Sequence, residues 1–286
     1  MTKYIRIFSL LLAFLLLAAC TMRPEISIDP HEGMVQVNDG TGMVWIPLIE
    51  ELQPNLLAAG DFKTENGIVT YSGRFLRGID VSEHQMEINW DAVAASGLAD
   101  FTFIRAGYRG YTEGQLFEDA WFRENMEGAG RNGIDIGVYF FSQAITPEEA
   151  VEEANFLLEL IGGYDIACPV VYDWEPMHIA GARTEGLDKN TLTECAIAFC
   201  ETIKAAGYEP MVYLYRYLGY HNYDLAALKD YPLWLGAPGE APDFYYAHNW
   251  WQYSYTGSVP GIEGDTDLNL YFPSLPAPET DEAEEN

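Results

Sequence analysis

Basic residues are scarce in this sequence. It carries 15 Lys and Arg against 44 Asp and Glu, a formal net charge of -29 at pH 7. A nucleic-acid surface needs a basic patch that neutralises phosphates. The scarcity of Lys and Arg therefore excludes nucleic acid as a partner. The acidic excess indicates a solvated acidic surface and says little about the substrate.

Cysteine is scarce as well, with 4 in the chain. Cys20 lies near the N-terminus, and Cys168, Cys195 and Cys200 show no metal-ligand spacing. Cys195 and Cys200 fall on different sides of a helical pattern, which favours small buried apolar residues over a disulfide. The sequence therefore predicts no disulfide framework.

The N-terminal apolar run is too short to span a bilayer. It extends from Ile7 to Ala19 after two basic residues, which is typical of an export signal. The segment Leu17-Ala18-Ala19-Cys20 is similar to a bacterial lipobox, which implies cleavage before Cys20 and a lipid on its thiol. An ordinary signal peptide with a chance cysteine is the alternative.

The rest of the composition suits one large domain with additions. The chain is 49% hydrophobic and 14% aromatic, enough to bury a large core. Short strand-like runs broken by turns precede Arg77, and acidic residues follow Pro276. The predicted division is a signal peptide (1–19), a tether (20–32), a small β-rich appendage (33–76), a barrel (77–273) and a disordered acidic tail (274–286).

From Arg77 onward, β-rich apolar runs alternate with helical patterns, which is typical of a parallel sheet wrapped by helices. The predicted fold is an irregular TIM-like β/α barrel with about eight strands and five helices. Strands are expected at 78–82, 101–107, 134–143, 168–175, 210–215, 233–237, 250–253 and 267–271. Helices are expected at 89–97, 118–132, 146–161 and 189–206, with little room for more in the last third.

Two carboxylates end the apolar run that begins at Val170. Residues two apart in a strand share a face, so Asp173 and Glu175 should point the same way with backbones roughly 6–7 Å apart. Glycosidases use carboxyl separations of about 5 to 9.5 Å. Barrel enzymes carry their chemistry at the carboxyl ends of buried parallel strands. This pair therefore indicates glycoside hydrolysis more than a solvated strand end.

Two further acids are expected beside this pair. Asp80 lies in the first barrel strand and Asp267 opens the last, and these strands are neighbours in a closed barrel. Taken singly, Asp80 could cap a turn and Asp267 could lie at a ladder edge. Clustered carboxylates raise one another's pKa, which supplies a protonated acid near neutral pH.

Three motifs occur in a family-specific order. They are Gly78-Ile79-Asp80-Val81-Ser82-Glu83-His84-Gln85, then Tyr172-Asp173-Trp174-Glu175, then Trp251-Gln252-Tyr253-Ser254 through Val259-Pro260-Gly261-Ile262 to Asp267-Leu268-Asn269. From about Gly78 to Phe272 the chain resembles glycoside hydrolase family 25, the Chalaropsis-type lysozymes. The resemblance implies an incomplete β/α barrel that cleaves the β-1,4 bond between N-acetylmuramic acid and N-acetylglucosamine in peptidoglycan.

The resemblance also implies roles for single residues. Glu175 is expected to be the acid/base, accompanied by Asp173, Asp80 and Asp267, with no metal and no cofactor. Two departures bear on substrate detail: Phe140 stands where many members have His, and Trp234-Leu235-Gly236-Ala237-Pro238 replaces a Trp-x-Ala-x-Tyr pattern.

Aromatic side chains at the predicted barrel mouth are candidates for sugar stacking, with core packing an equal alternative for each. Arg105 is expected either to hold one acid ionised or to form a structural ion pair. The candidate substrate-binding residues are Arg105, Tyr108, Tyr139, Trp174, Tyr213, Trp251 and Gln252.

The sequence as a whole predicts a monomeric peptidoglycan hydrolase, lipid-anchored on the outer face of the bacterial cytoplasmic membrane and facing the cell wall. Two alternatives stay open: a non-catalytic glycan-binding lipoprotein on the same barrel, and a glycosidase for another N-acetylhexosamine polymer. Inversion or retention depends on the carboxyl separation in three dimensions, so both remain possible.

Overall fold

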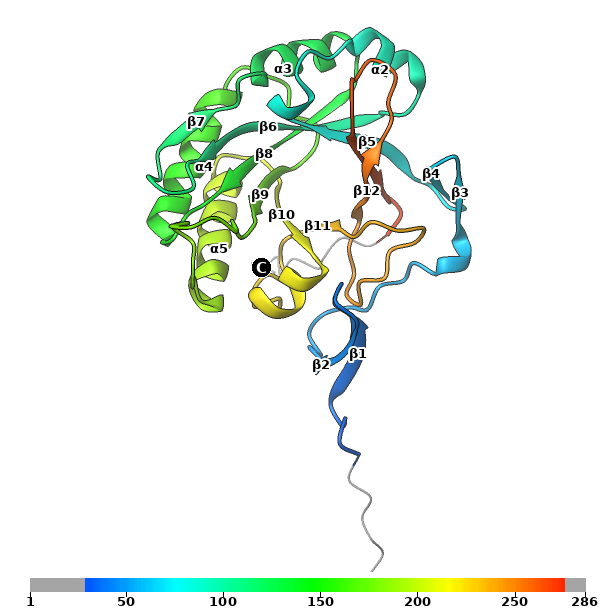
Figure 1. Cartoon of the computed structure of the whole chain (residues 1–286), viewed down its shortest axis with the longest axis vertical. Helices are drawn as coiled ribbons and strands as arrows, with labels where there is room; N and C mark the ends of the chain where they lie inside the picture. The colour runs from blue at the N-terminus through cyan, green and yellow to red at the C-terminus, as the bar shows by residue number, and fades with distance from the viewer. Residues whose placement is uncertain (1–28, 276–286) are drawn as a thin grey trace, which may run out of the picture.

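The computed structural model describes residues 29–275 (Figure 1). The predicted signal peptide, Cys20, most of the tether and all but the start of the acidic tail lie outside the described residues. Two hairpins precede a closed barrel, and helices cover part of its outer surface.

The barrel contains all eight expected strands. They are β5 (Leu76–Val81), β6 (Phe101–Arg109), β8 (Asp135–Ser142), β9 (Val170–Trp174), β10 (Pro210–Tyr215), β11 (Leu233–Gly236), β12 (Trp250–Gly257) and β13 (Thr266–Tyr271). Their spatial order is β5-β13-β12-β11-β10-β9-β8-β6, and pairing of β5 with β6 closes the barrel. A short strand, β7 (Leu116–Glu118), extends the edge of β6. The predicted irregular barrel is confirmed.

One barrel strand runs against the others. β13 pairs antiparallel with β12 and with β5, whereas the other barrel pairs are parallel. The start of β13 therefore lies beside the carboxyl ends of the parallel strands. This reversal brings Asp267, near the start of β13, opposite Asp80 in β5.

Four α-helices are present in the described residues: α2 (Trp90–Ser96), α3 (Phe122–Arg131), α4 (Pro147–Ile161) and α5 (Lys189–Ala205). A π-helical turn, η3 (Leu218–Asn222), connects β10 to β11. The start of α4 follows its sequence signals, because the Thr146 hydroxyl accepts from the Glu149 amide (3.3 Å) and Pro147 occupies the first turn.

The predicted helix over 118–132 starts later than expected, at Phe122. Glu118 belongs to β7. The buried Asp119 carboxylate accepts hydrogen bonds from the amides of Glu83 (3.0 Å) and Trp121 (2.9 Å). The predicted start was wrong because these contacts, one with a distant residue, stabilise a turn before the helix.

Large side chains fill the barrel interior. The ring centroids of Phe103 and Trp234 lie 4.6 Å apart, and Trp250 stacks on Tyr271 at 3.8 Å. The interior is therefore a packed core and no pore. Its buried members are Phe101, Phe103, Val171, Met211, Tyr213, Trp234 and Trp250.

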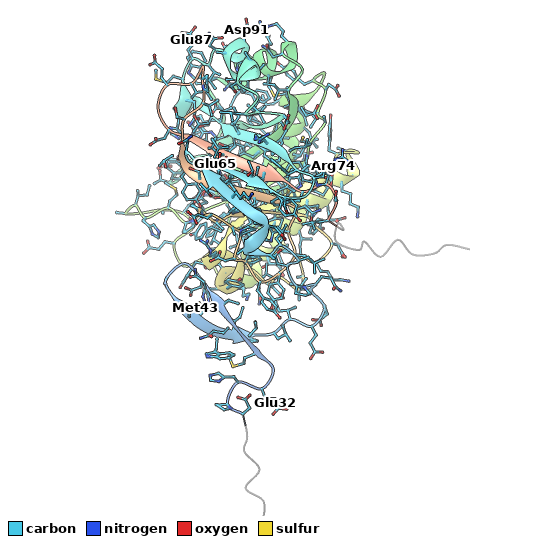
Figure 2. All side chains as sticks on the ribbon, turned by 90° about the vertical axis from the view of Figure 1, so that its right-hand side faces the viewer. Glu32, Met43, Glu65, Arg74, Glu87 and Asp91 are labelled. Atoms are coloured by element: carbon cyan, nitrogen blue, oxygen red, sulfur yellow. The ribbon has the colours of Figure 1, made fainter. Side chains whose placement is uncertain are left out.

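The predicted β-rich appendage consists of two hairpins. The first, β1 (Met34–Asn38) with β2 (Met43–Pro47), projects from the barrel. The second, β3 (Phe62–Glu65) with β4 (Ile68–Tyr71), lies against the barrel, with Phe62 packed edge-on against Trp251 at 5.4 Å. Figure 2 shows Met43 on the projecting hairpin and Glu65 over the barrel. The sequence did not predict β3, because Phe62 is its one apolar residue and a strand pattern needs several.

Within residues 29–275, no helix combines the length and the apolar character needed to cross a membrane. The cysteines of this part of the chain, Cys168, Cys195 and Cys200, carry free thiols. Burial raises the pKa of each thiol, so each is unreactive at neutral pH.

Candidate active site

A cleft of about 600 Å³ opens at the carboxyl ends of the parallel strands. The four predicted acids come from β5, β9, the residue after β9 and β13, and all of them line this cleft: Asp80, Asp173, Glu175 and Asp267. The other lining residues are His84, Arg105, Tyr139, Phe141, Pro176, His178, Tyr213, Tyr215, Trp234, Gln252 and Tyr255.

Asp80 and Asp267 face each other across the β5–β13 ladder. Like charges directly opposite one another are destabilising, and burial raises the pKa of both carboxyls, that of Asp267 to about 9. The Gln252 amide donates to Asp80 (2.9 Å) and more weakly to Asp267 (3.4 Å), and the Asn269 amide donates to Asp80 (2.7 Å). Asp80 is therefore the ionised member of the pair, and Asp267 holds the proton.

Two ring groups orient the amides that hold Asp80. The Trp234 indole donates to the Asn269 amide oxygen (2.8 Å), and the Tyr213 hydroxyl donates to the Gln252 amide oxygen (2.9 Å). With each amide oxygen occupied, each NH₂ group points to the Asp80 carboxylate. The negative charge of Asp80 is thus fixed in place.

Asp173 and Glu175 are both shifted toward the protonated form. Burial, followed by the charge of Glu175, raises the pKa of Asp173 well above its usual range. Burial, followed by the charge of Asp80, raises the pKa of Glu175 to about 7. Glu175 remains partly exposed to the cleft. It can therefore hold a proton at neutral pH and offer it to a bound molecule.

Four of the predicted substrate-binding residues line the cleft: Arg105, Tyr139, Tyr213 and Gln252. Arg105 forms ion pairs with Asp119 (2.7 Å) and Glu83 (3.0 Å). Arg105 therefore forms the structural ion pairs that were one of its two predicted roles. Its positive charge also opposes the rise in the pKa of Asp173.

The other three candidates do not line the cleft. Successive strand residues face opposite sides, so Trp174 points away from the face shared by Asp173 and Glu175, and Trp251 away from that of Gln252. Trp251 instead donates to the Ala237 carbonyl (2.8 Å) outside the barrel interior. Tyr108 stacks on Phe117 at 5.2 Å.

Two tyrosines that line the cleft, Tyr215 and Tyr255, were not among the predicted substrate-binding residues. Tyr215 lies two residues after Tyr213 on β10, so strand alternation could have identified it. Tyr255 follows an irregularity in the β12–β13 register after Gln252, which breaks the alternation. The hydroxyls of Tyr213 and Tyr255 approach Gly236 where a Cβ atom would lie, so glycine here leaves room for both.

The acids do not form a metal site. In the part of the chain that the structure describes, no group of His, Cys, Asp or Glu is arranged to hold a metal ion. A second cavity of about 420 Å³ lies at the opposite end of the barrel, and Glu51 is the one acid among its lining residues. The raised pKa values of Glu175 and Asp267 let these carboxyls hold protons near neutral pH, so the chemistry that they support is proton transfer.

Comparison with known families agrees with this geometry. The sequence profile of the glycosyl hydrolases family 25 matches residues 79–262, more than half of the chain. The chain belongs to glycosyl hydrolase family 25. The matched region includes Asp80, Asp173 and Glu175, whereas Asp267 lies just beyond it.

Two curated proteins are similar to this family 25 chain. The autolytic lysozyme of Clostridium acetobutylicum is 28% identical over 197 residues, which cover 68% of this chain and 56% of that protein. Lysozyme M1 of Streptomyces globisporus is 28% identical over 265 residues, covering 88% of this chain and 86% of that protein. The chain thus spans little more than half of the first relative.

Solved structures share the family 25 barrel. The lysozyme of Streptomyces coelicolor is 26% identical with a TM-score of 0.56, and the match covers 68% of this chain and 91% of that one. The modular autolysin LytC of Streptococcus pneumoniae, solved with a synthetic peptidoglycan ligand, is 23% identical with a TM-score of 0.63. That match covers 84% of this chain and 57% of LytC and shows the common fold.

Proposed function

We propose that this chain hydrolyses the β-1,4 bond between N-acetylmuramic acid and N-acetylglucosamine in peptidoglycan. The observation that carries this proposal is the convergence of Glu175 with three other carboxyls in one cleft. Membership of family 25 and similarity to two proteins named as lysozymes support it.

The cleft contains the groups that this reaction needs. Glu175, with its pKa raised to about 7, donates a proton to the glycosidic oxygen. The fixed carboxylate of Asp80 faces the same space and stabilises positive charge on the sugar in the transition state. Because the proton must be present on Glu175, activity declines as the pH rises through about 7.

The bond specificity is tested by mass spectrometry of digested, purified peptidoglycan. A muramidase leaves muramic acid at every new reducing end, and that is the expected product. New reducing ends made of N-acetylglucosamine would contradict the proposal. Faster release of reducing sugar from a chitin oligosaccharide than from peptidoglycan would favour another N-acetylhexosamine polymer as the substrate. Binding to peptidoglycan without any release of muropeptides would favour a non-catalytic glycan-binding protein.

We further propose that the protein is a lipoprotein held on the outer face of the bacterial cytoplasmic membrane through Cys20. The support is the lipobox-like segment Leu17-Ala18-Ala19-Cys20 together with an acidic composition that anionic lipid head groups repel. Durable anchoring requires more than one acyl chain, which matches the diacylglyceryl group that lipobox processing installs.

Cys20→Ser is expected to move the protein from the membrane fraction into the medium or to leave an unprocessed precursor. The variant loses the thiol that would carry the lipid, while its barrel stays intact and active on soluble muropeptides. Fractionation of expressing cells, with Cys168→Ser as the matched control, measures the effect. A Cys20→Ser protein that is processed and fractionates like the wild type would leave an ordinary signal peptide as the explanation.

A further inference from the structure

Glu175 lies just beyond the end of the strand that carries it. The β8–β9 ladder ends with the pair Ser142 and Trp174, so the next residues, Gln143 and Glu175, are outside the ladder. The side-chain amide of Gln143 donates to the main-chain carbonyl of Glu175 (2.9 Å) and to that of Ser142 (2.7 Å). A side chain thus ties the two strand ends together where backbone pairing stops.

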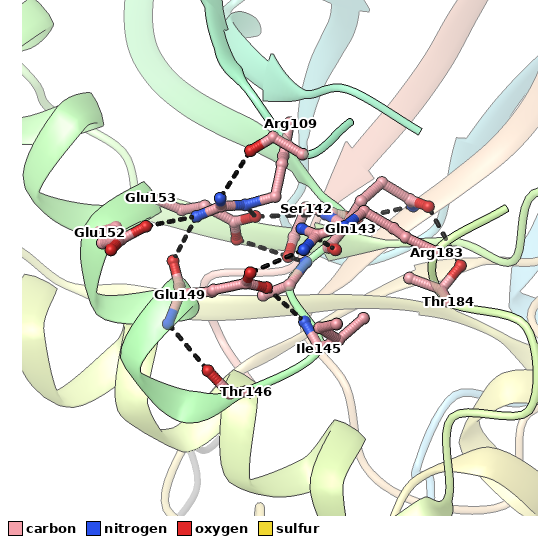
Figure 3. Close-up of polar contacts among 12 residues, drawn as sticks. Arg109, Ser142, Gln143, Ile145, Thr146, Glu149, Glu152, Glu153, Arg183 and Thr184 are labelled. Atoms are coloured by element: carbon pink, nitrogen blue, oxygen red, sulfur yellow. Dashed lines mark hydrogen bonds and ion pairs between the residues drawn. The ribbon is translucent and has the colours of Figure 1, made fainter. Parts of the chain in front are cut away.

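Every polar group of Gln143 has a partner. Its amide oxygen accepts from the Thr184 hydroxyl (3.1 Å), its main-chain carbonyl accepts from Arg183 (3.0 Å), and its main-chain amide donates to Glu153 (3.3 Å). Figure 3 shows Gln143 beside Arg183 and Thr184. Because the Thr184 hydroxyl occupies the amide oxygen, the NH₂ group faces Glu175.

The surroundings of Gln143 keep it rigid. Its side chain is fully buried, and it is not among the residues that line the cleft. Arg183 forms an ion pair with Glu149 on α4 (2.6 Å), which binds the segment after Glu175 to that helix. Glu153, which accepts from the main-chain amide of Gln143, forms an ion pair with Arg109 (2.7 Å). Gln143 therefore connects Glu175 to the scaffold without reaching the substrate space.

We propose that Gln143 is a positioning residue for Glu175, holding the main chain at residue 175 so that the carboxyl stays in the cleft beside Asp80. This inference rests on the proposed function of Glu175 as the proton donor. Misplacing a reacting group by about 1 Å can cost on the order of 10²-fold in rate. The raised pKa of Glu175 comes first from burial, so releasing its main chain lowers that pKa toward the usual value.

Gln143→Met tests the proposal, because methionine keeps the length of the side chain and has no NH₂ group. We expect kcat on peptidoglycan to fall about 10- to 100-fold with KM little changed, since substrate contacts remain. The alkaline limb of the pH profile should move to lower pH by about one unit as Glu175 gains solvent. Titration of the Glu175 carboxyl by carbon-13 NMR should show the same shift without substrate.

Two companion variants separate positioning from general loss of stability. Thr193→Val removes a buried hydroxyl in α5, outside the cleft lining, that donates to the Lys189 carbonyl (2.8 Å) and accepts from the Asp224 amide (2.9 Å). It should lower the melting temperature without moving the pH profile. Thr184→Val leaves Gln143 in place but frees its amide to rotate, and should give a smaller shift in the same direction.

A folded Gln143→Met protein with wild-type kcat and an unshifted Glu175 titration would overturn the proposal. If Gln143→Met does not fold, Thr184→Val decides, and an unshifted titration in that variant would overturn it equally. A wild-type protein that releases no muropeptide would instead refute the proposed function, whereas the NMR titration would still report whether Gln143 controls the pKa of Glu175.

Discussion

Glu175→Gln is expected to lower kcat on purified peptidoglycan by about 10² to 10⁴, the usual contribution of a general acid. Glutamine keeps the shape of the side chain and cannot donate a proton of comparable acidity to the leaving oxygen. Glu175 is the carboxyl whose pKa, raised to about 7 by burial and by the charge of Asp80, suits proton donation near neutral pH. The release of reducing sugar measures the loss.

Glu209→Gln is the matched control for this experiment. Glu209 directly precedes β10, at the opposite end of the barrel, and burial also raises the pKa of its carboxyl. The same chemical change there should leave kcat unchanged. Wild-type release of reducing sugar by Glu175→Gln, or an equal loss in Glu209→Gln, would contradict the assignment of Glu175.

Asp173→Asn is expected to make the protein more stable at neutral pH and less active. Burial and the charge of Glu175 raise the folded-state pKa of Asp173, so the folded protein retains a proton that the unfolded chain releases. Protonated Asp173 therefore contributes its whole stabilisation of the folded state at pH values below the unfolded-state pKa. This contribution is lost as the pH rises toward the folded-state pKa. One Asp173 carboxyl oxygen also lacks a hydrogen-bond partner among the described residues.

A neutral amide at position 173 removes this pH-dependent loss. We expect a higher melting temperature than that of the wild type at about pH 7.5. The slope of melting temperature against pH should flatten from about pH 4, the usual pKa of an Asp carboxyl, up to neutral pH. Hydrolysis should fall by at least about 10-fold, because the cluster loses a carboxyl that lines the cleft.

Calorimetry across that pH range checks the stability prediction. Asp188→Asn is the control, because the exposed Asp188 caps α5 by accepting from the Asn190 amide (3.0 Å), and asparagine caps about as well. Its slope against pH should match that of the wild type over most of the range. A lower melting temperature for Asp173→Asn at neutral pH would show that the protein gains stability from an ionised Asp173.

Local patterns in the sequence determined the barrel strands, three of the four α-helices and the positions of the four acids at strand ends. Apolar runs with β-branched residues, such as Val170 and Val171, specify a buried strand wherever the chain places it. Thr146 and Pro147 start α4 through contacts within one helical turn. Strand alternation also predicts the outward direction of Trp174, although its place at the predicted barrel mouth made it a candidate for sugar stacking.

Contacts between distant parts of the chain decided the rest. The turn at Asp119 depends on Glu83, and the orientation of the Asp80 carboxylate depends on Gln252, which lies 172 residues away in sequence. The support of Glu175 by Gln143 appears only when β8 and β9 lie side by side. The pKa of Glu175 is also a tertiary property. Burial and the nearby charge of Asp80 set it, and both come from the closing of the barrel, which brings residues far apart in sequence into one low-dielectric cleft.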